Sequence, residues 1–229
     1  MENSAAVETD EPITLACWAY ATDGTENSAL LALGSAVDDD LIQIRITSVE
    51  YVRAETVANG GLSNSQSTSQ FSLNTWFHAA GVFAANNSRI AYLNGEAGPE
   101  QTTNRVANDL DTTTIGAYML EGANGYYLTG RVAEAAVWNV ALTAAEIAIL
   151  AARYSPLFVR PQNLSAYWPL IRDEDQDRVG GYDLTPSGSP TIAAHPPIIY
   201  PAPPFVGLAA AGAPPVSAEP KLLAMLGVG

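Results

Sequence analysis

Acidic side chains are the first residues to consider for chemistry, and their densest group lies near the C-terminal end of the chain. It comprises Asp173, Glu174, Asp175 and Asp177, between the segments WPLIR and RVGGYDL. Hydrolysis of a glycosidic bond needs two carboxylates that face each other across a cleft, about 5 Å apart in retaining enzymes. This group falls instead in a predicted solvated turn, and no carboxylates alternate along a predicted strand. We therefore predict no catalytic residues and no enzymatic activity.

Other catalytic and metal-binding side chains are sparse. His78 and His195 are the only histidines, and Cys17 is the only cysteine. These three residues are too few and too scattered for a zinc site, which needs at least three ligands close together. No Gly-x-Ser-x-Gly motif supports a Ser-His-Asp triad. Cys17 alternates with apolar residues of a predicted strand, which indicates a buried, inert thiol.

The clearest structural pattern lies in residues 74–96, which contain two apolar runs separated by a polar stretch. The first run is rich in aromatic residues, as in β-strands, and Asn86, Asn87 and Ser88 form the predicted turn that follows it. Asn94 and Gly95 predict a second, tight turn, because both residues tolerate a positive φ. Further strands are predicted at residues 13–20, 29–34, 41–47 and 49–56, whereas residues 59–70 are predicted to be a polar loop.

The segments TWFHAAGVF, RIAYLNGE, TTTIGAY and GRVAEAAVWNVALTAAEIAIL follow one another along the chain. Over residues 12–154 this order resembles the laminin G-like domains of the concanavalin A-like lectin/glucanase superfamily. The resemblance implies an all-β jelly-roll sandwich of two antiparallel sheets with one short helix. At one position the chain departs from the family pattern: Ala133 stands where the family often has Asp, although Glu134 is kept.

Two features extend this interpretation. Thr143 and Glu146 form the pattern of a capping box, which predicts the start of the helix. Helical spacing predicts one apolar face formed by Ile147, Leu150, Ala151 and Tyr154. Residues 163–184, with AYWPL and YDLT, resemble the opening strands of many laminin G-like domains, so a permuted sandwich with a closing strand from this segment is predicted.

The resemblance raises two kinds of ligand. Related sandwiches often bind Ca²⁺ through loop oxygens, and the candidate ligands here are Asp38, Asp40, Asp109 and Asp111, although turn acids in water are the favoured interpretation. No other cofactor is predicted. Tyr118, Tyr126 and Tyr127 could stack on sugar rings, although packing within the sandwich is the favoured role for them.

The charge balance bears on partners. The chain of 229 residues has 24 acidic and 10 basic side chains, a formal charge of −14. Such a surface repels phosphate backbones and is not attracted to anionic lipid, so neither nucleic acid nor a membrane is a predicted partner. The acidic N-terminal residues do not form a secretion signal, and the single cysteine favours synthesis in a reducing cytoplasm.

Three parts of the chain are predicted: an N-terminal arm at residues 1–11, the sandwich at 12–199, and an extended C-terminal arm at 200–229 rich in Pro, Ala and Gly. The C-terminal arm is predicted to contact a neighbouring subunit. Its proposed contact residues are Tyr200, Pro203, Pro204, Phe205, Leu222, Leu223, Met225 and Leu226.

The laminin G-like pattern is combined here with the segments AYWPL, DRVGGYDLT and HPPIIYPAPP. This combination resembles capsid decoration and surface proteins of tailed bacteriophages, so the first functional hypothesis from the sequence is a virion structural protein. It would be made in the host cytoplasm and contact capsid proteins and copies of itself. The alternative is a carbohydrate-binding, lectin-like module for host attachment, with glycans as partners. A glycan hydrolase is the third hypothesis, and the missing acid pair argues against it.

Overall fold

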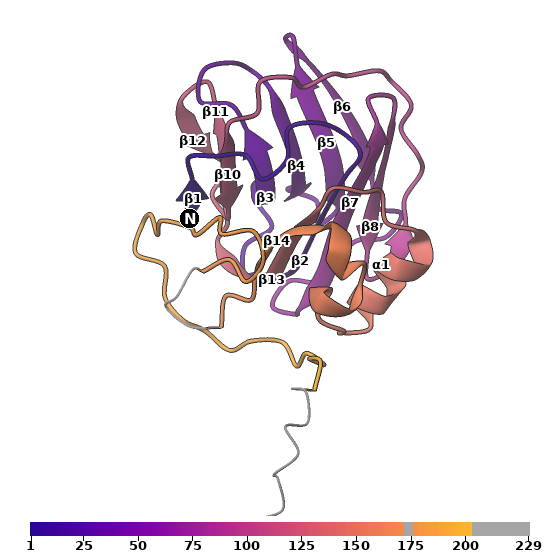
Figure 1. Cartoon of the computed structure of the whole chain (residues 1–229), viewed down its shortest axis with the longest axis vertical. Coiled ribbons are helices and arrows are strands. Elements are labelled where there is room, and N and C mark those ends of the chain that lie inside the picture. Colours follow the sequence, from indigo (N-terminus) through magenta and orange to yellow (C-terminus); the bar gives the residue numbers. More distant parts are fainter. Residues whose placement is uncertain (172–175, 203–229) are drawn as a thin grey trace, which may run out of the picture.

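The fold is a sandwich of two six-stranded antiparallel sheets, seen in a computed structural model that describes residues 1–171 and 176–202 (Figure 1). The first sheet contains, in spatial order, β1 (Glu2–Asn3), β10 (Thr112–Ile115), β3 (Ser28–Gly34), β4 (Leu41–Ile46), β5 (Val52–Ala58) and β6 (Gly61–Gln66). The second contains β14 (Leu164–Trp168), β13 (Gly130–Trp138), β2 (Ile13–Ala21), β7 (Phe77–Ala85), β8 (Ser88–Leu93) and β9 (Glu96–Ala97). The predicted all-β sandwich is confirmed.

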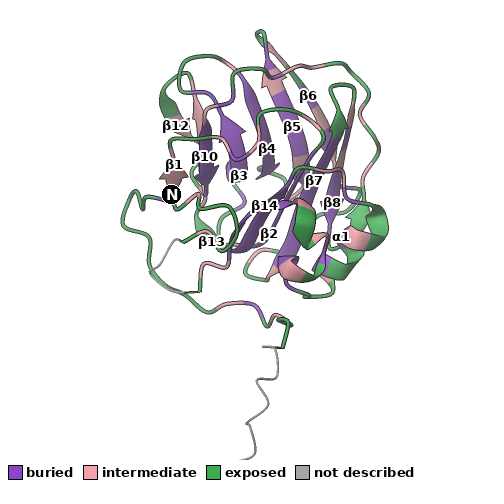
Figure 2. Ribbon diagram, viewed as in Figure 1, coloured by how far each residue is buried: buried purple, intermediate pink, exposed green. Residues whose placement is uncertain are grey.

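The main core lies between the two sheets, whose central strands are largely buried (Figure 2) and contribute apolar side chains to it. Leu15 and Cys17 of β2 face this core together with Ile44 of β4. Gly81 of β7 faces the opposite sheet at close range, because a Cβ there would lie 2.7 Å from Ile44 Cγ2. A second apolar cluster covers the outer face of the second sheet, where Trp138 and Tyr167 pack beneath the helix.

Two local predictions are confirmed in the β7–β8–β9 region. Asn86 and Asn87 alone connect β7 to β8. Asn94 and Gly95 connect β8 to β9 with φ values of 52° and 87°, as a tight hairpin turn requires.

The helix α1 (Ala144–Ala151) begins as predicted. The Glu146 amide donates to Thr143 Oγ1 at 3.3 Å, and the Thr143 amide donates to Glu146 Oε2 at 2.8 Å. Ile147 and Leu150 are buried. The prediction that Tyr154 belongs to this apolar face was wrong, because the helix ends at Ala151 and Tyr154 is 39% exposed. Within the described ranges, no helix has the length and apolar character to span a bilayer.

Replacement of Thr143 by alanine is expected to lower the free energy of unfolding by about 1 kcal/mol, the usual value for an N-cap. The change removes the side-chain acceptor for the Glu146 amide and half of the reciprocal pair. Chemical denaturation measures the effect, and Thr143→Ser, which keeps the hydroxyl, is the matched control. An unchanged midpoint for the alanine variant would show that the cap contributes nothing.

Two segments differ from their predictions. Residues 59–70 were predicted to be a loop, but residues 61–66 form β6. Its polar side chains are accommodated by hydrogen bonds, since Ser65 Oγ donates to the Pro99 carbonyl at 2.6 Å and accepts from the Ala91 amide at 2.9 Å. The N-terminal segment, predicted as an arm, packs along the first sheet, where β1 pairs with β10 and Val7 is buried.

Glu11, two residues before β2, has a buried carboxyl group. Neither carboxyl oxygen has a hydrogen-bond partner among the described residues. Burial raises the pKa of this carboxyl to about 7, and the nearby charge of Arg89 only partly opposes that effect. Its contribution to stability is therefore present below the unfolded pKa near 4.5 and is lost as the pH rises through about 7.

We expect Glu11→Gln to stabilise the protein at pH 8 by about 1 kcal/mol, after allowance for solvent screening of a half-exposed group. At pH 4 the variant and the parent should unfold at nearly the same denaturant concentration. Unfolding curves recorded at both values test this. Glu8→Gln is the comparison variant, and an equal effect of the two changes, or no gain for Glu11→Gln at pH 8, would contradict the prediction.

Candidate functional site

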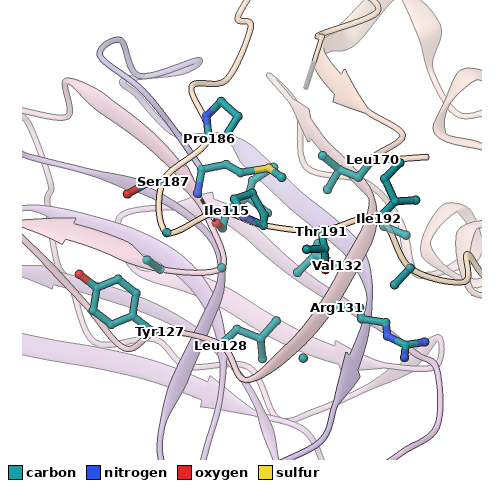
Figure 3. Close-up of a pocket in the computed structure, with 18 of the residues that line it drawn as sticks. Ile115, Tyr127, Leu128, Arg131, Val132, Leu170, Pro186, Ser187, Thr191 and Ile192 are labelled. Atoms are coloured by element: carbon teal, nitrogen blue, oxygen red, sulfur yellow. Dashed lines mark hydrogen bonds between the residues drawn. The ribbon is translucent and has the colours of Figure 1, made fainter. Parts of the chain in front are cut away.

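A cavity lies between β10 of one sheet and β13 of the other (Figure 3). Its volume is about 910 Å³, within the range of small-ligand sites. Residues 186–195 run along it after the last strand and supply one wall. The site is therefore built from both sheets and from the chain that follows them.

The floor of the cavity is apolar. Ile115 ends β10, Leu128 lies in the loop before β13, Val132 lies within β13, and Leu170 follows β14. Figure 3 shows Ile115, Leu128 and Val132 on the side of the cavity opposite the wall segment that carries Thr191 and Ile192. These side chains continue the inter-sheet core outward, so the cavity opens from the edge of the sandwich interior.

Aromatic and charged groups form the rim. Tyr127 is 68% exposed and follows β12 (Ala123–Gly125), which pairs with β11 (Tyr118–Leu120). Trp76 packs edge-on against Tyr20 with ring centroids 5.7 Å apart. The Arg131 guanidinium lies 4.7 Å from the centre of the same Tyr20 ring, which fixes it at the rim.

A polar pair completes the lining at β1 and β12. Asn124 donates from Nδ2 to Glu2 Oε2 at 3.1 Å. Asn124 Oδ1 is buried and has no hydrogen-bond partner in the described ranges. The wall thus contains a buried amide oxygen that lacks a protein donor.

Next to the cavity, Glu134 gathers three other side chains. It is 3% exposed, and it accepts from Tyr167 Oη at Oε2 and from Tyr200 Oη at Oε1, both at 2.7 Å. His195 Nε2 lies 3.3 Å from Glu134 Oε1. A bulge between Ala133 and Ala136 interrupts β13 here, and Glu134 has φ = 54°. The bulge takes Glu134 out of the regular alternation of the strand.

The calcium candidates are not brought together. Asp40 Oδ2 accepts from the amides of Asn108 and Asp109 at 2.6 and 3.0 Å, and Asp111 Oδ1 accepts from the Ala36 amide at 2.9 Å. The Asp38 carbonyl accepts from the Glu121 amide. No cluster of three potential ligands occurs in residues 1–171 and 176–202. Asp40 and Asp111 accept hydrogen bonds from backbone amides of neighbouring loops, and Asp40 is buried, whereas turn acids in water were the favoured interpretation.

The other residues considered from the sequence lie in different surroundings. Tyr118 and Tyr126 pack on each other with centroids 4.9 Å apart, whereas Tyr127 lines the cavity. His78 is buried beside Trp18, and burial lowers its pKa to about 3. Burial also raises the pKa of the Cys17 thiol. Asp177 accepts from four backbone amides, those of Tyr167, Val179, Gly180 and Tyr182.

The acids at 173–175 and the proposed contact residues Pro203, Pro204, Phe205, Leu222, Leu223, Met225 and Leu226 lie outside the described residues. Tyr200, which we predicted to contact a partner, donates to Glu134 of its own sandwich and remains 40% exposed. Sequence reasoning missed Trp76, Arg131 and the wall at 186–195. Two signals in the sequence pointed toward this region: the retained Glu134, and Tyr127, which was considered for sugar stacking.

A sequence model described as the concanavalin A-like lectin/glucanases superfamily matches residues 2–148. No curated protein matches the sequence. Among solved structures, a heptameric SAP-like pentraxin from Limulus polyphemus is similar at 14% identity and a TM-score of 0.53, covering 66% of this chain and 74% of the pentraxin.

Two other similar structures concern carbohydrate binding. The CBM40 of a Ruminococcus gnavus IT-sialidase, bound to α2,3 sialyllactose, is 16% identical with a TM-score of 0.57, covering 66% of this chain and 93% of that one. A putative carbohydrate binding protein from Bacteroides ovatus is 21% identical with a TM-score of 0.56, covering 79% of this chain and 54% of that one. At these identities the likeness shows a shared fold.

Proposed function

The chain belongs to the concanavalin A-like lectin/glucanases superfamily, and from this premise we propose that it is a non-catalytic carbohydrate-binding module. The proposed binding site is the cavity between β10 and β13. The observation that carries the proposal is the combination of an exposed aromatic ring, Tyr127, with an apolar floor and polar groups at the rim. The Ruminococcus CBM40 and the Bacteroides carbohydrate binding protein support it as an analogy within one fold.

The chemistry of a sugar fits this lining. A pyranose ring has an apolar face of C–H groups and an edge of hydroxyls, so it needs both a flat aromatic or aliphatic surface and hydrogen-bond partners. Tyr127 supplies the aromatic surface, and Asn124 and Arg131 supply an acceptor and donors. A cavity of about 910 Å³ has room for a short oligosaccharide.

The environments of two acidic residues argue against catalysis. Glu134, the acid next to the cavity, is buried, and both of its carboxyl oxygens accept hydrogen bonds from tyrosines. A general acid must reach the leaving oxygen of the substrate, which this side chain cannot do in its present place. Asp177 is likewise occupied by backbone amides. We propose that bound glycan is released unchanged.

A glycan array on the full chain tests the proposal, with and without Ca²⁺, and affinities for the hits are then measured by calorimetry. We expect Tyr127→Ala to weaken binding at least tenfold, because removal of a central aromatic contact typically costs about 2 kcal/mol. Tyr154→Ala removes an exposed tyrosine elsewhere and is the matched control. Binding that is equally tight in both variants would move the site elsewhere, and a blank array would contradict the proposed function.

The virion structural role is a second proposal, favoured by one surface. Ile149, Phe158 and Ile199 are each more than 40% exposed and lie near Tyr154, which pairs with Phe158 and forms a bridge with Ile199. Such an apolar surface beside the end of the described chain suits contact with a capsid protein or a second copy. Co-purification of the unsubstituted protein with phage particles would support this role, provided that Phe158→Ser no longer co-purifies.

A further inference from the structure

Residues 186–194, here called the strap, form a wall of the cavity but have few attachments of their own. They are exposed, and none of them makes a hydrogen bond to another described residue. Their N-terminal end is fixed by Thr185, whose amide donates to the Glu2 carbonyl at 2.7 Å and whose carbonyl accepts from the Glu2 amide at 3.0 Å. The position of the strap therefore depends on what holds its other end.

That other end is held by His195. Its Nδ1 lies 2.8 Å from the Pro196 carbonyl oxygen, and its Nε2 lies 3.1 Å from the Pro169 carbonyl oxygen and 3.3 Å from Glu134 Oε1. All three oxygens can only accept a hydrogen bond from the ring. Both ring nitrogens must therefore donate, and this requires the doubly protonated, cationic imidazole.

We propose that Glu134 is a positioning residue for the cavity: with His195 and Tyr200 it forms a clasp that holds the strap in place, and the clasp is complete only while both nitrogens of His195 are protonated. Tyr200 anchors the chain five residues further on by donating to the same carboxylate. The part of this inference that concerns ligand affinity rests on the proposed glycan-binding function.

Loss of a proton from His195 opens the clasp for a simple reason. A neutral imidazole has one donor nitrogen and one lone pair. The lone pair then points at a carbonyl or carboxylate oxygen, and an attractive contact becomes repulsive. No residue of the strap makes a hydrogen bond in the described structure, and the next attachment along the chain is Ile199, whose amide donates to the Arg153 carbonyl at 2.8 Å. Release of His195 therefore leaves the segment between Thr185 and Ile199 without a hydrogen bond to the sandwich, and the wall can move away from Val132 and Leu128.

The surroundings of His195 favour the cation. Burial lowers its pKa, but the hydrogen bond to Glu134, the hydrogen bond to Pro196 and the charge of Glu134 outweigh burial and raise it. The other described titratable groups of this cluster are Tyr167 on β14 and Tyr200 after the strap, and burial raises the pKa of both. Glu2 and Arg131 are charged side chains on the cavity wall. The clasp is thus closed below the ordinary histidine pKa and opens as the pH rises through the folded value.

Methyl NMR of the full chain tests the clasp without any ligand. The titration of the His195 ring is followed together with the order parameter of the Ile192 methyl group and its NOEs to Val132. We expect the histidine to titrate above its ordinary value near 6.5 and the Ile192 NOEs to vanish with the same midpoint. His195→Gln should leave the strap mobile at every pH, and Glu134→Gln should shift the midpoint downward.

Tyr200→Phe is the matched control, since it removes a donor to Glu134 but leaves the His195 contacts, so its strap should still respond to pH. An Ile192 methyl group that is equally ordered on both sides of the histidine titration overturns the clasp. A pKa of His195 at or below the ordinary histidine value also overturns the clasp.

Glycan affinity is then measured on both sides of the titration. We expect about tenfold weaker binding with the strap open, the effect of losing one charge-assisted hydrogen bond. If the strap opens but no glycan binds at any pH, the clasp is supported and the proposed function fails. If a glycan binds equally well with the strap open and closed, the clasp does not position the site and that part of the inference is overturned.

Discussion

Truncation of the chain after Tyr154 is expected to leave no cooperatively folding protein. The deletion removes β14, which pairs with β13 from Ala135↔Trp168 to Trp138↔Leu164. Trp168 is fully buried, and its indole N–H donates to the Tyr182 carbonyl at 2.8 Å. Without β14 the buried strand β13 becomes an exposed edge and the core is open on one side.

The single substitution Trp168→Ala tests the same idea more gently. Deletion of a fully buried tryptophan is expected to lower the free energy of unfolding by about 3–5 kcal/mol. Urea denaturation measures this loss, and truncation after Ala202, which keeps all of the described elements, is the control that should fold normally. A soluble fragment of residues 1–154 with a sharp unfolding transition would show that the domain closes without its last strand.

Local sequence signals predicted the elements that local chemistry determines. Thr143 and Glu146 identified the start of α1, and Asn94 with Gly95 identified a hairpin turn, because a cap and a turn depend on residues a few positions apart. The strand β6 was missed because Ser65 within it bonds to Pro99 and Ala91, which are distant in sequence. No pattern within residues 59–70 could reveal that these partners exist.

The candidate site was less predictable than the fold for the same reason. Glu134, Tyr167 and His195 come from two strands and a later segment, and only the pairing of β13 with β14 brings the first two together. His195 precedes a Pro-Pro pair, which indicates a loop but not what the loop crosses. Tyr127 was one of three tyrosines considered for sugar stacking, and only the hairpin geometry separates it from Tyr118 and Tyr126.

Glu55→Ala is expected to be the most destabilising substitution on the outer face of the first sheet. Glu55 and Arg45 are both about 95% buried there, where Glu55 Oε2 accepts from Arg45 Nη2 at 2.9 Å and Glu55 Oε1 accepts from Gln43 Nε2 at 3.0 Å. Removal of one partner leaves an uncompensated buried charge, which typically costs about 3–5 kcal/mol. Denaturation at neutral pH measures the loss.

The double variant Arg45→Met with Glu55→Leu separates the charge from the packing. Replacement of a buried ion pair by apolar residues of similar size is often neutral, so it should unfold close to the parent and far above Glu55→Ala. It also removes the guanidinium that lies 5.7 Å from the Tyr126 ring centre, next to Tyr127 in the chain. We therefore expect the double variant to regain stability but to bind glycan more weakly than the parent. If the free energy of unfolding of Glu55→Ala falls by less than about 1 kcal/mol, water reaches Arg45 in the variant. The Arg45–Glu55 ion pair would then not fix the β11–β12 hairpin, which carries the rim of the cavity.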